Sequence, residues 1–291
     1  MPSEPHRRAR RRLPLEWLGI LPFAIFAFLF LILPTLRIVT GAFQSPEGGF
    51  TFQNLLDLNT ASIRNAYWTS IKLSLITAAL GCAVGFAMAA AVVFGGLPKG
   101  VRSPLLTFSG VASNFAGVPL AFAFIATLGP AGLVTLWLKT EFGINLRAMG
   151  FNLLSFWGLV VTYLFFQIPL MILIIIPALD GLKKEWREAA AVLGATATQY
   201  WRMVAMPVLW PSLLGTFALL FANAFGAVAT AMALTGSSLS IVPIKLFAQI
   251  RGDVLHNPHL GYALAFGMIV VTGLANVFYI WIRSRSERWL K

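Results

Sequence analysis

Long apolar stretches alternate with short polar loops along most of this chain. A helix needs about 20 apolar residues to cross a bilayer. Stretches of that length with no charged residue near their middle occupy residues 18–39, 67–94, 105–128, 153–179, 208–235 and 260–282. The pattern therefore predicts an all-α polytopic membrane protein with six transmembrane helices. It also sets the expected boundaries: a segment over residues 1–16, a transmembrane domain over residues 17–282, and a tail over residues 283–291.

The polar loop over residues 180–207 carries a helical pattern of its own. Apolar side chains recur at every third or fourth position, at Leu182, Trp186, Ala189 and Leu193, with Lys183, Lys184, Arg187 and Glu188 on the other sides. Gly194 follows where a helix end favours a residue that tolerates the left-handed conformation. Thr196 and Gln199 then have the spacing of a capping box for a second helix, which we expect to end near Pro207. The loop is predicted to be a short helix–turn–helix between two membrane spans.

The residues of this loop resemble a known motif, the EAA loop. Glu188, Ala189 and Ala190 are followed after three residues by Gly194, and nine residues further on by Val204-Ala205-Met206-Pro207. The pattern is similar to E-A-A, three residues, Gly, nine residues and I-x-L-P, which marks permease subunits of binding-protein-dependent type I ABC importers. Val204 and Met206 replace Ile and Leu, which are conservative apolar changes. The resemblance extends from about Tyr67 to the C-terminus, so residues 18–39 would be a peripheral extra span.

This resemblance implies a function and a set of partners. Permeases of this family are non-catalytic membrane subunits, so ATP and Mg²⁺ would bind to two partner ATP-binding cassette subunits and this chain would carry no cofactor. Their ATPases receive the EAA loop in a surface groove, which would make Glu188 the coupling acid. A second permease subunit and an external solute-binding protein would complete the importer in the bacterial inner membrane. We expect the second permease to be a paralogue rather than a copy of this chain.

Composition and charge agree with a membrane location. Of 291 residues, 58% are hydrophobic and 11% charged, and the mean hydropathy is +0.80, which is too apolar for a soluble domain of this size. The net charge is +12, and basic residues gather in alternate loops, at Arg7, Arg8, Arg10, Arg11, Arg12, Lys99, Arg102, Lys183, Lys184, Arg187, Arg202, Arg283, Arg285, Arg288 and Lys291. Basic residues favour the cytoplasmic side, so both termini and the loop over residues 180–207 are predicted to be cytoplasmic. Because these residues flank apolar spans, anionic lipid explains them better than nucleic acid does.

Several chemistries lack the residues they need. The sequence contains no G-x-x-x-x-G-K-[ST] phosphate loop, no H-E-x-x-H and no G-x-S-x-G. Cys82 is the only cysteine, which excludes an intrachain disulfide, and we interpret His256 and His259 around Pro258 as a turn rather than a metal pair. A secondary carrier or a membrane scaffold is the alternative of another class. Carriers often place ionisable residues or ion-coordinating broken helices within the membrane, and neither is evident from the pattern.

A few polar residues inside the spans are candidates for the solute path: Asn114, Gln167, Asn223 and Thr230. Each could instead form an interhelical hydrogen bond worth about 0.6 kcal/mol. Asn114 near Pro119 and Asn223 before Gly226 are favoured, because Pro and Gly allow a helix to bend. The small-residue rows at Gly81, Gly85 and Ala89, and at Ala222 and Gly226, predict close helix packing.

The residues do not select a solute. The general pattern, with Phe52-Gln53-Asn54-Leu55 before the second span, is similar to permeases of the polyamine, opine and phosphonate group. A polyamine or a related small amine or organic solute is therefore the expected cargo. Permeases for iron and thiamine share the same layout, so iron, thiamine and phosphonate stay open as alternatives.

Overall fold

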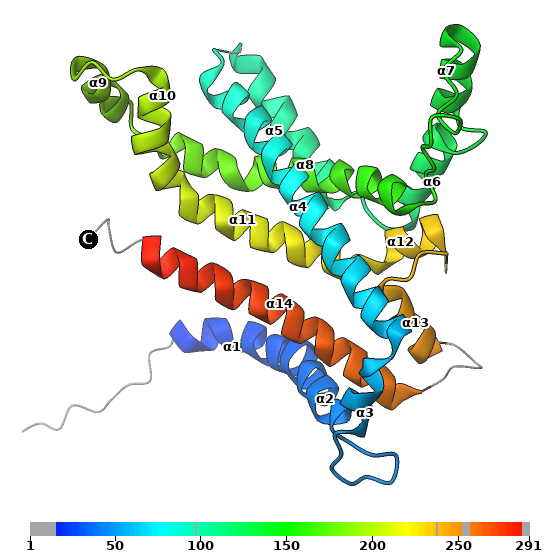
Figure 1. Cartoon of the computed structure of the whole chain (residues 1–291). Helices are drawn as coiled ribbons and strands as arrows, with labels where there is room; N and C mark the ends of the chain where they lie inside the picture. Colours follow the sequence, from blue (N-terminus) through cyan, green and yellow to red (C-terminus); the bar gives the residue numbers. More distant parts are fainter. Residues whose placement is uncertain (1–15, 97, 237, 252–256, 287–291) are drawn as a thin grey trace, which may run out of the picture.

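The computed structural model describes residues 16–96, 98–236, 238–251 and 257–286 (Figure 1). Over these residues the regular structure is helical, apart from one isolated β-bridge between Gln44 and Phe50. Six helices are long and apolar enough to cross a membrane, at Gly19–Ala42, Ala61–Phe94, Val118–Phe142, Phe156–Asp180, Ala197–Gly226 and Pro258–Ser284. The predicted all-α fold with six spans is confirmed. The basic cluster from Arg7 to Arg12, Arg288, Lys291 and His256 lie outside the described residues.

The elements follow one another as α1 (Glu16–Ala27), η1 (Phe28–Ile32), α2 (Leu33–Ala42), α3 (Gln53–Leu56), η2 (Asp57–Asn59), α4 (Ala61–Phe94), α5 (Lys99–Asn114), α6 (Val118–Leu128), α7 (Leu133–Phe142), α8 (Phe156–Asp180), α9 (Lys184–Val192), α10 (Ala197–Tyr200), η3 (Trp201–Ala205), α11 (Met206–Gly226), α12 (Val228–Thr235), α13 (Val242–Arg251) and α14 (Pro258–Ser286). Helices α4, α8 and α11 pack against one another, α5 packs on α8, and α14 lies between α11 and α2. The first span is peripheral, as expected, because no residue is buried in its most apolar stretch of 18 residues.

Small residues let α4 and α8 approach closely, which confirms the close packing predicted for the first small-residue row. Gly81, Gly85 and Ala89 are buried, and a Cβ built on Gly85 would lie 2.6 Å from the Cβ of Met171. The prediction for the second row is wrong within this chain. Gly226 is exposed, and a Cβ added there would meet no atom within 4 Å. Helix α11 presents this row to a cavity instead of a packed neighbour.

Two helices are interrupted where unbroken spans were expected. The predicted span over residues 105–128 stops at Asn114 and restarts at Val118, because Gly117 has a φ of +77° and Pro119 lies in the first turn of α6. The predicted span over residues 208–235 breaks at Ala227, whose ψ of 89° is not helical. Both predicted spans were therefore wrong in their bounds.

The expected helix end near Pro207 was also wrong. Helix α10 continues without interruption through the π-helical turn η3 into α11, which gives a helix of 30 residues over Ala197–Gly226. In this turn the Met206 N–H donates to the Trp201 carbonyl, five residues back, and Pro207 follows at once. Proline has no N–H and its ring crowds the preceding turn, so a widened turn accommodates it. The same arrangement precedes Pro34, where the Leu33 N–H donates to the Phe28 carbonyl.

The two described ends of the chain and the loop over residues 180–207 lie toward the same side of the molecule. In Figure 1 the start of α1, the end of α14 and the α9–α10 hairpin all lie toward the left, while α12 and α13 lie toward the right. Which side faces the cytoplasm stays a prediction from the basic residues.

Cysteine labelling tests that prediction. In a Cys82→Ser background, single cysteines at Ser45 and Thr140 are expected to react with a membrane-impermeant maleimide in intact cells, because both lie on the side opposite to the basic loops. Cysteines at Ser103 and Ser284 are expected to react only after the membrane is opened. Labelling of Ser284 from outside would contradict the predicted orientation.

Candidate functional site

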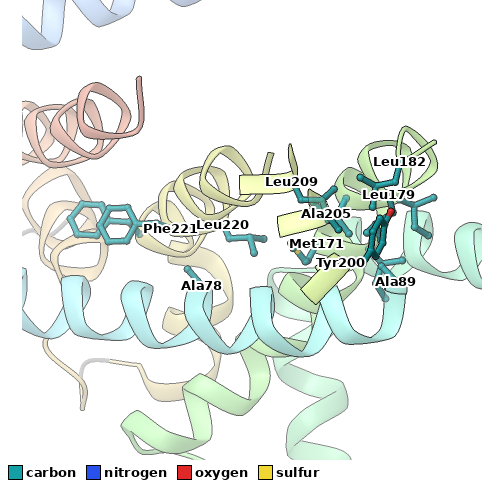
Figure 2. Packing of buried hydrophobic residues seen from close by; sticks show 14 residues of the cluster. Ala78, Ala89, Met171, Leu179, Leu182, Tyr200, Ala205, Leu209, Leu220 and Phe221 are labelled. Atoms are coloured by element: carbon teal, nitrogen blue, oxygen red, sulfur yellow. The ribbon is translucent and has the colours of Figure 1, made fainter. Parts of the chain in front are cut away.

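The loop between α8 and α11 is a compact helical hairpin with a buried base. Figure 2 shows Leu179, Leu182 and Tyr200 gathered beside Ala89 of α4, and these residues belong to one buried cluster. From α9, Trp186 and Ala190 pack against the same cluster. On α9 the buried stripe therefore follows the i, i+4 pair of Trp186 and Ala190, and Leu182, just before the helix, adds to it. The base of the hairpin is fixed to the helices that enter and leave it.

The predicted apolar stripe was wrong at two of its four positions. Ala189 is exposed, and Leu193 is 86% exposed. Leu193 is the C-cap of α9 with a ψ of 3°, so its side chain leaves the helical row. Val192 beside it is 88% exposed. Together Val192 and Leu193 form an apolar tip on the hairpin, which the periodicity had assigned to the interior.

The turn of the hairpin has the predicted geometry. Gly194 has a φ of +78°, and the Ala195 N–H closes the end of α9 by donating to the Ala190 carbonyl at 2.9 Å. The capping box is present: the Thr196 N–H donates to Oε1 of Gln199 at 2.7 Å, and the Gln199 N–H donates to Oγ1 of Thr196 at 3.3 Å. Both predictions are confirmed. These bonds hold the tip in a fixed orientation relative to α10.

The motif residues divide between the surface and the packed base. Glu188 and Ala189 are exposed, whereas Ala190 is half-buried against the core. Val204 packs on the same core from η3, Met206 is half-buried, and Pro207 is exposed. The first half of the motif is thus available to another molecule, while its second half anchors the hairpin.

A second feature lies where the two interrupted helices meet. A cavity of about 440 Å³ is lined from both breaks by Ser113, Ala116, Gly117, Phe166, Ala222, Asn223, Gly226, Ala227, Val228, Ala229 and Thr230. We call it the helix-break cavity. Its side-chain polar groups are hydroxyls and one amide, with no charged residue in its lining. The cavity can therefore form hydrogen bonds with a solute, and its own wall carries no fixed charge.

Long-range hydrogen bonds stabilise both breaks. The Gly117 N–H donates to Oγ1 of Thr230 at 2.7 Å, and the Tyr163 hydroxyl, from α8, donates to the Ala227 carbonyl. A backbone group left unpaired at membrane depth costs several kcal/mol, so interruptions persist only where other groups pair it. Tyr163 and Gly117 were missed in the sequence; the Gly117-Val118-Pro119 run was the available signal for the first break.

The four candidate path residues have different surroundings. Asn223 and Thr230 line the helix-break cavity. Asn114 is exposed next to Ser113 and donates to the Gly110 carbonyl. Gln167 is fully buried between α8 and α11, where its Nε2 donates to the Leu220 carbonyl at 2.9 Å. The cavity thus brings two of the four together, and Gln167 is used in helix packing.

Removing the hydroxyl that supports the first break is expected to destabilise the protein. Thr230→Val keeps the shape but leaves the Gly117 N–H without an acceptor, which costs about 1–3 kcal/mol when the group is buried. Thr230→Ser retains the oxygen and is the matched control. Thermal unfolding of the purified protein should show a lower midpoint for Thr230→Val than for Thr230→Ser; equal midpoints would contradict the role given to this bond.

Comparison with known proteins identifies relatives over most of the chain. The family model described as "Binding-protein-dependent transport system inner membrane component" matches residues 83–291. The spermidine/putrescine transport system permease protein PotC of Escherichia coli K12 is 22% identical over 239 residues, which cover 79% of this chain and 81% of that protein. A putative ferric transport system permease protein, FbpB 1 of Haemophilus influenzae, is 25% identical over 283 residues; they cover 92% of this chain but 42% of that protein.

Solved structures show the same fold. A chain from the crystal structure of a bacterial ABC transporter involved in import of the acidic polysaccharide alginate superposes with a TM-score of 0.70 at 17% identity, covering 95% of this chain and 96% of that one. A chain from the alginate transporter in complex with its pentasaccharide-bound periplasmic protein gives a TM-score of 0.68 at 15% identity, covering 91% and 92%.

Proposed function

Because the chain belongs to the family of binding-protein-dependent transport system inner membrane components, we propose that it forms part of the path for a polyamine or a related small amine. The family fixes the general function: the chain is a non-catalytic, multi-pass inner-membrane permease of an ABC importer, and ATP is bound by partner ATPases. A second permease, two ATPase subunits and a solute-binding protein complete the proposed assembly.

The hairpin formed by α9 and α10 is the proposed docking element for an ATPase subunit. Its exposed tip, Val192 and Leu193, presents apolar surface next to the exposed carboxylate of Glu188. Its base is buried through Leu182 and Tyr200. A partner that moves the tip would therefore move the ends of α8 and α11 with it, since the turn at Gly194 is held by the capping box.

The continuous helix over Ala197–Gly226 connects the hairpin with the helix-break cavity. It has 30 residues and so spans roughly 45 Å. Its first turn belongs to the docking element, and its last residues, Asn223 and Gly226, line the cavity. This single helix is the observation that carries the proposal, because it gives a direct mechanical link between the ATPase side and the candidate path.

The chemistry of the cavity is compatible with a cationic amine. Ammonium groups donate hydrogen bonds, and the Asn223 amide oxygen and the Ser113 hydroxyl are acceptors. An uncharged lining would let a cation pass without holding it tightly. The similarity to PotC, named for spermidine and putrescine, favours this class. Iron is the second candidate, because the H. influenzae relative named for ferric transport matches 92% of this chain.

Thermal stabilisation of the cognate solute-binding protein tests the proposed cargo. Spermidine and putrescine are expected to raise its unfolding midpoint, since a ligand that binds only the folded state stabilises it in proportion to the logarithm of its concentration over Kd. Ferric citrate, thiamine and a phosphonate serve as comparison ligands. Uptake of the stabilising solute is then measured in proteoliposomes that contain the whole importer. Stabilisation by iron alone would replace the polyamine proposal with the second candidate.

A further inference from the structure

A larger cavity lies at the base of the α9–α10 hairpin, where several helices end. Its volume is about 1010 Å³, and its walls come from the end of α4, the start of α5, the end of α8, and from α9 and α10. In Figure 1 the hairpin lies at the upper left, and the paired ends of α4 and α5 lie to its right at the top of the molecule. The exposed tip, Val192 and Leu193, is not part of its lining. The basal cavity thus shares Glu188 with the proposed docking element but does not include its apolar tip.

The polar part of the basal cavity is predominantly basic. Its four cationic side chains are Arg102, Lys183, Lys184 and Arg187, against two carboxylates, Asp180 and Glu188. Arg102 and Asp180 form an ion pair with each other, which removes one charge of each sign. Lys183 lies over the Trp186 ring, with Nζ 5.9 Å from its centroid. Within the described part of the chain, Lys184 and Arg187 take part in no ion pair. An excess of positive charge is left for a ligand.

The other wall of the basal cavity is apolar and aromatic. Val93, Phe94 and Leu179 come from the last turns of α4 and α8, and Trp201 contacts Phe94 with ring centroids 5.5 Å apart. These turns end two of the helices that are long and apolar enough to cross a membrane, so we infer that the wall lies near the bilayer surface. Tryptophan is enriched at that level. An apolar wall therefore continues directly from the bilayer into a basic rim.

From this juxtaposition we propose that the basal cavity binds the headgroup of an anionic phospholipid, with Lys184 and Arg187 on the phosphate and the acyl chains along Phe94 and Trp201. Basic pockets between membrane helices recognise anionic headgroups in this way. A soluble anion would use the basic rim but gain nothing from the apolar wall. A bound lipid would bridge α9 to the end of α4 and the start of α5, and so hold the hairpin to the bundle.

Lipid binding to the intact importer tests this proposal. Native mass spectrometry of the purified complex, with phosphatidylglycerol or phosphatidylcholine added, should show tighter binding of phosphatidylglycerol. Lys184→Gln combined with Arg187→Gln should weaken that binding on the order of tenfold, because each lost charge near the surface removes part of the attraction. The exchange Lys184→Arg with Arg187→Lys keeps the charge and should bind normally. Lys139→Gln, in α7, is the control for loss of a basic residue elsewhere.

Three outcomes would overturn the proposal. They are equal binding of the two lipids, unchanged binding in the glutamine variant, and displacement of the lipid by millimolar inorganic phosphate, which would assign the site to a soluble anion. A second measurement needs no variant. A photoactivatable phosphatidylglycerol should crosslink the wild-type complex on peptides that contain Phe94 or Lys184; crosslinks confined to other segments would also overturn it.

Discussion

Replacing Gly194 with valine is expected to reduce solute uptake about tenfold without unfolding the membrane domain. Gly194 has a φ of +78°, and a Cβ added there would meet no atom within 4 Å, so the effect is purely one of backbone strain. A non-glycine residue in the left-handed conformation costs about 1–2 kcal/mol, and more when it is branched at Cβ. The strain would be relieved by rotating α9 relative to α10, which moves Glu188 and the apolar tip out of register with the ATPase.

A matched series at the same position separates strain from side-chain size. Gly194→Asn is expected to retain most of the uptake, since asparagine is the residue that best tolerates this conformation after glycine. Gly194→Ala should fall between asparagine and valine. Uptake and binding-protein-stimulated ATP hydrolysis are measured side by side in proteoliposomes. The coupling role of this turn is wrong if valine and asparagine give the same uptake as glycine.

Loss of the Glu188 carboxylate is expected to act on the same step. Glu188 is exposed on α9 and forms no ion pair within the described part of the chain, so a partner subunit is its proposed contact. Truncating one member of an interfacial charge pair costs about 2–5 kcal/mol, which corresponds to roughly 30-fold or more. Glu188→Ala should therefore lower uptake at least as much as Gly194→Val. The affinity of the binding protein for its solute should not change.

Glu185→Ala is the matched control for this substitution. Glu185 is also an exposed acid on α9, but it lies one turn closer to the buried base. Its removal should affect only the charge at the helix start, worth about 0.3–1 kcal/mol. Equal uptake in the two variants would show that Glu188 has no special contact with the ATPase.

The sequence predicted the features that depend on neighbouring residues. The left-handed turn at Gly194 and the capping box of Thr196 and Gln199 involve short spacings along the chain, and both are present. The close approach at Gly85 followed from a row on one helix face. Hydropathy likewise gave the number of spans, because each span needs only enough apolar residues in succession.

The pattern indicated possible bends near Pro119 and Gly226 but not full helix breaks, because the support for the breaks comes from distant parts of the chain. Thr230 pairs a backbone group 113 residues away, and Tyr163 pairs one 64 residues away. Hydropathy averages over a window and does not register a short interruption between apolar segments. At Pro207 the local signal gave the wrong prediction. Proline favours a helix end, but the π-helical turn before it accommodates the ring and the helix continues. The pattern therefore predicted two lining residues of the candidate path, Asn223 and Thr230, while the cavity itself was found only in the structure.

Adding one methyl group at Gly85 is expected to give the largest loss of stability of any substitution considered for the membrane core. The new Cβ would lie 2.6 Å from the Met171 Cβ and 2.9 Å from the Ile168 carbonyl oxygen. Both atoms belong to, or are fixed directly on, the backbone of α8, so no side-chain rotation relieves the overlap. The two helices must move apart, and overpacking of this kind costs about 1–3 kcal/mol. Since α4 and α8 form the centre of the bundle, the separation should reach α11 as well.

Two other glycines provide a graded comparison for Gly85→Ala. A Cβ at Gly81 would lie 3.0 Å from the Gln167 Cβ, a milder overlap, and one at Gly273 in α14 would meet nothing within 4 Å. The thermal midpoint of the detergent-solubilised permease should therefore fall most for Gly85→Ala, less for Gly81→Ala, and not at all for Gly273→Ala, where alanine is also the better helix former. If Gly85→Ala unfolded at the same temperature as Gly273→Ala, the close contact between α4 and α8 would not be a determinant of stability. The predicted order follows from the free space around the added Cβ, because the same methyl group is added to a membrane helix in every variant.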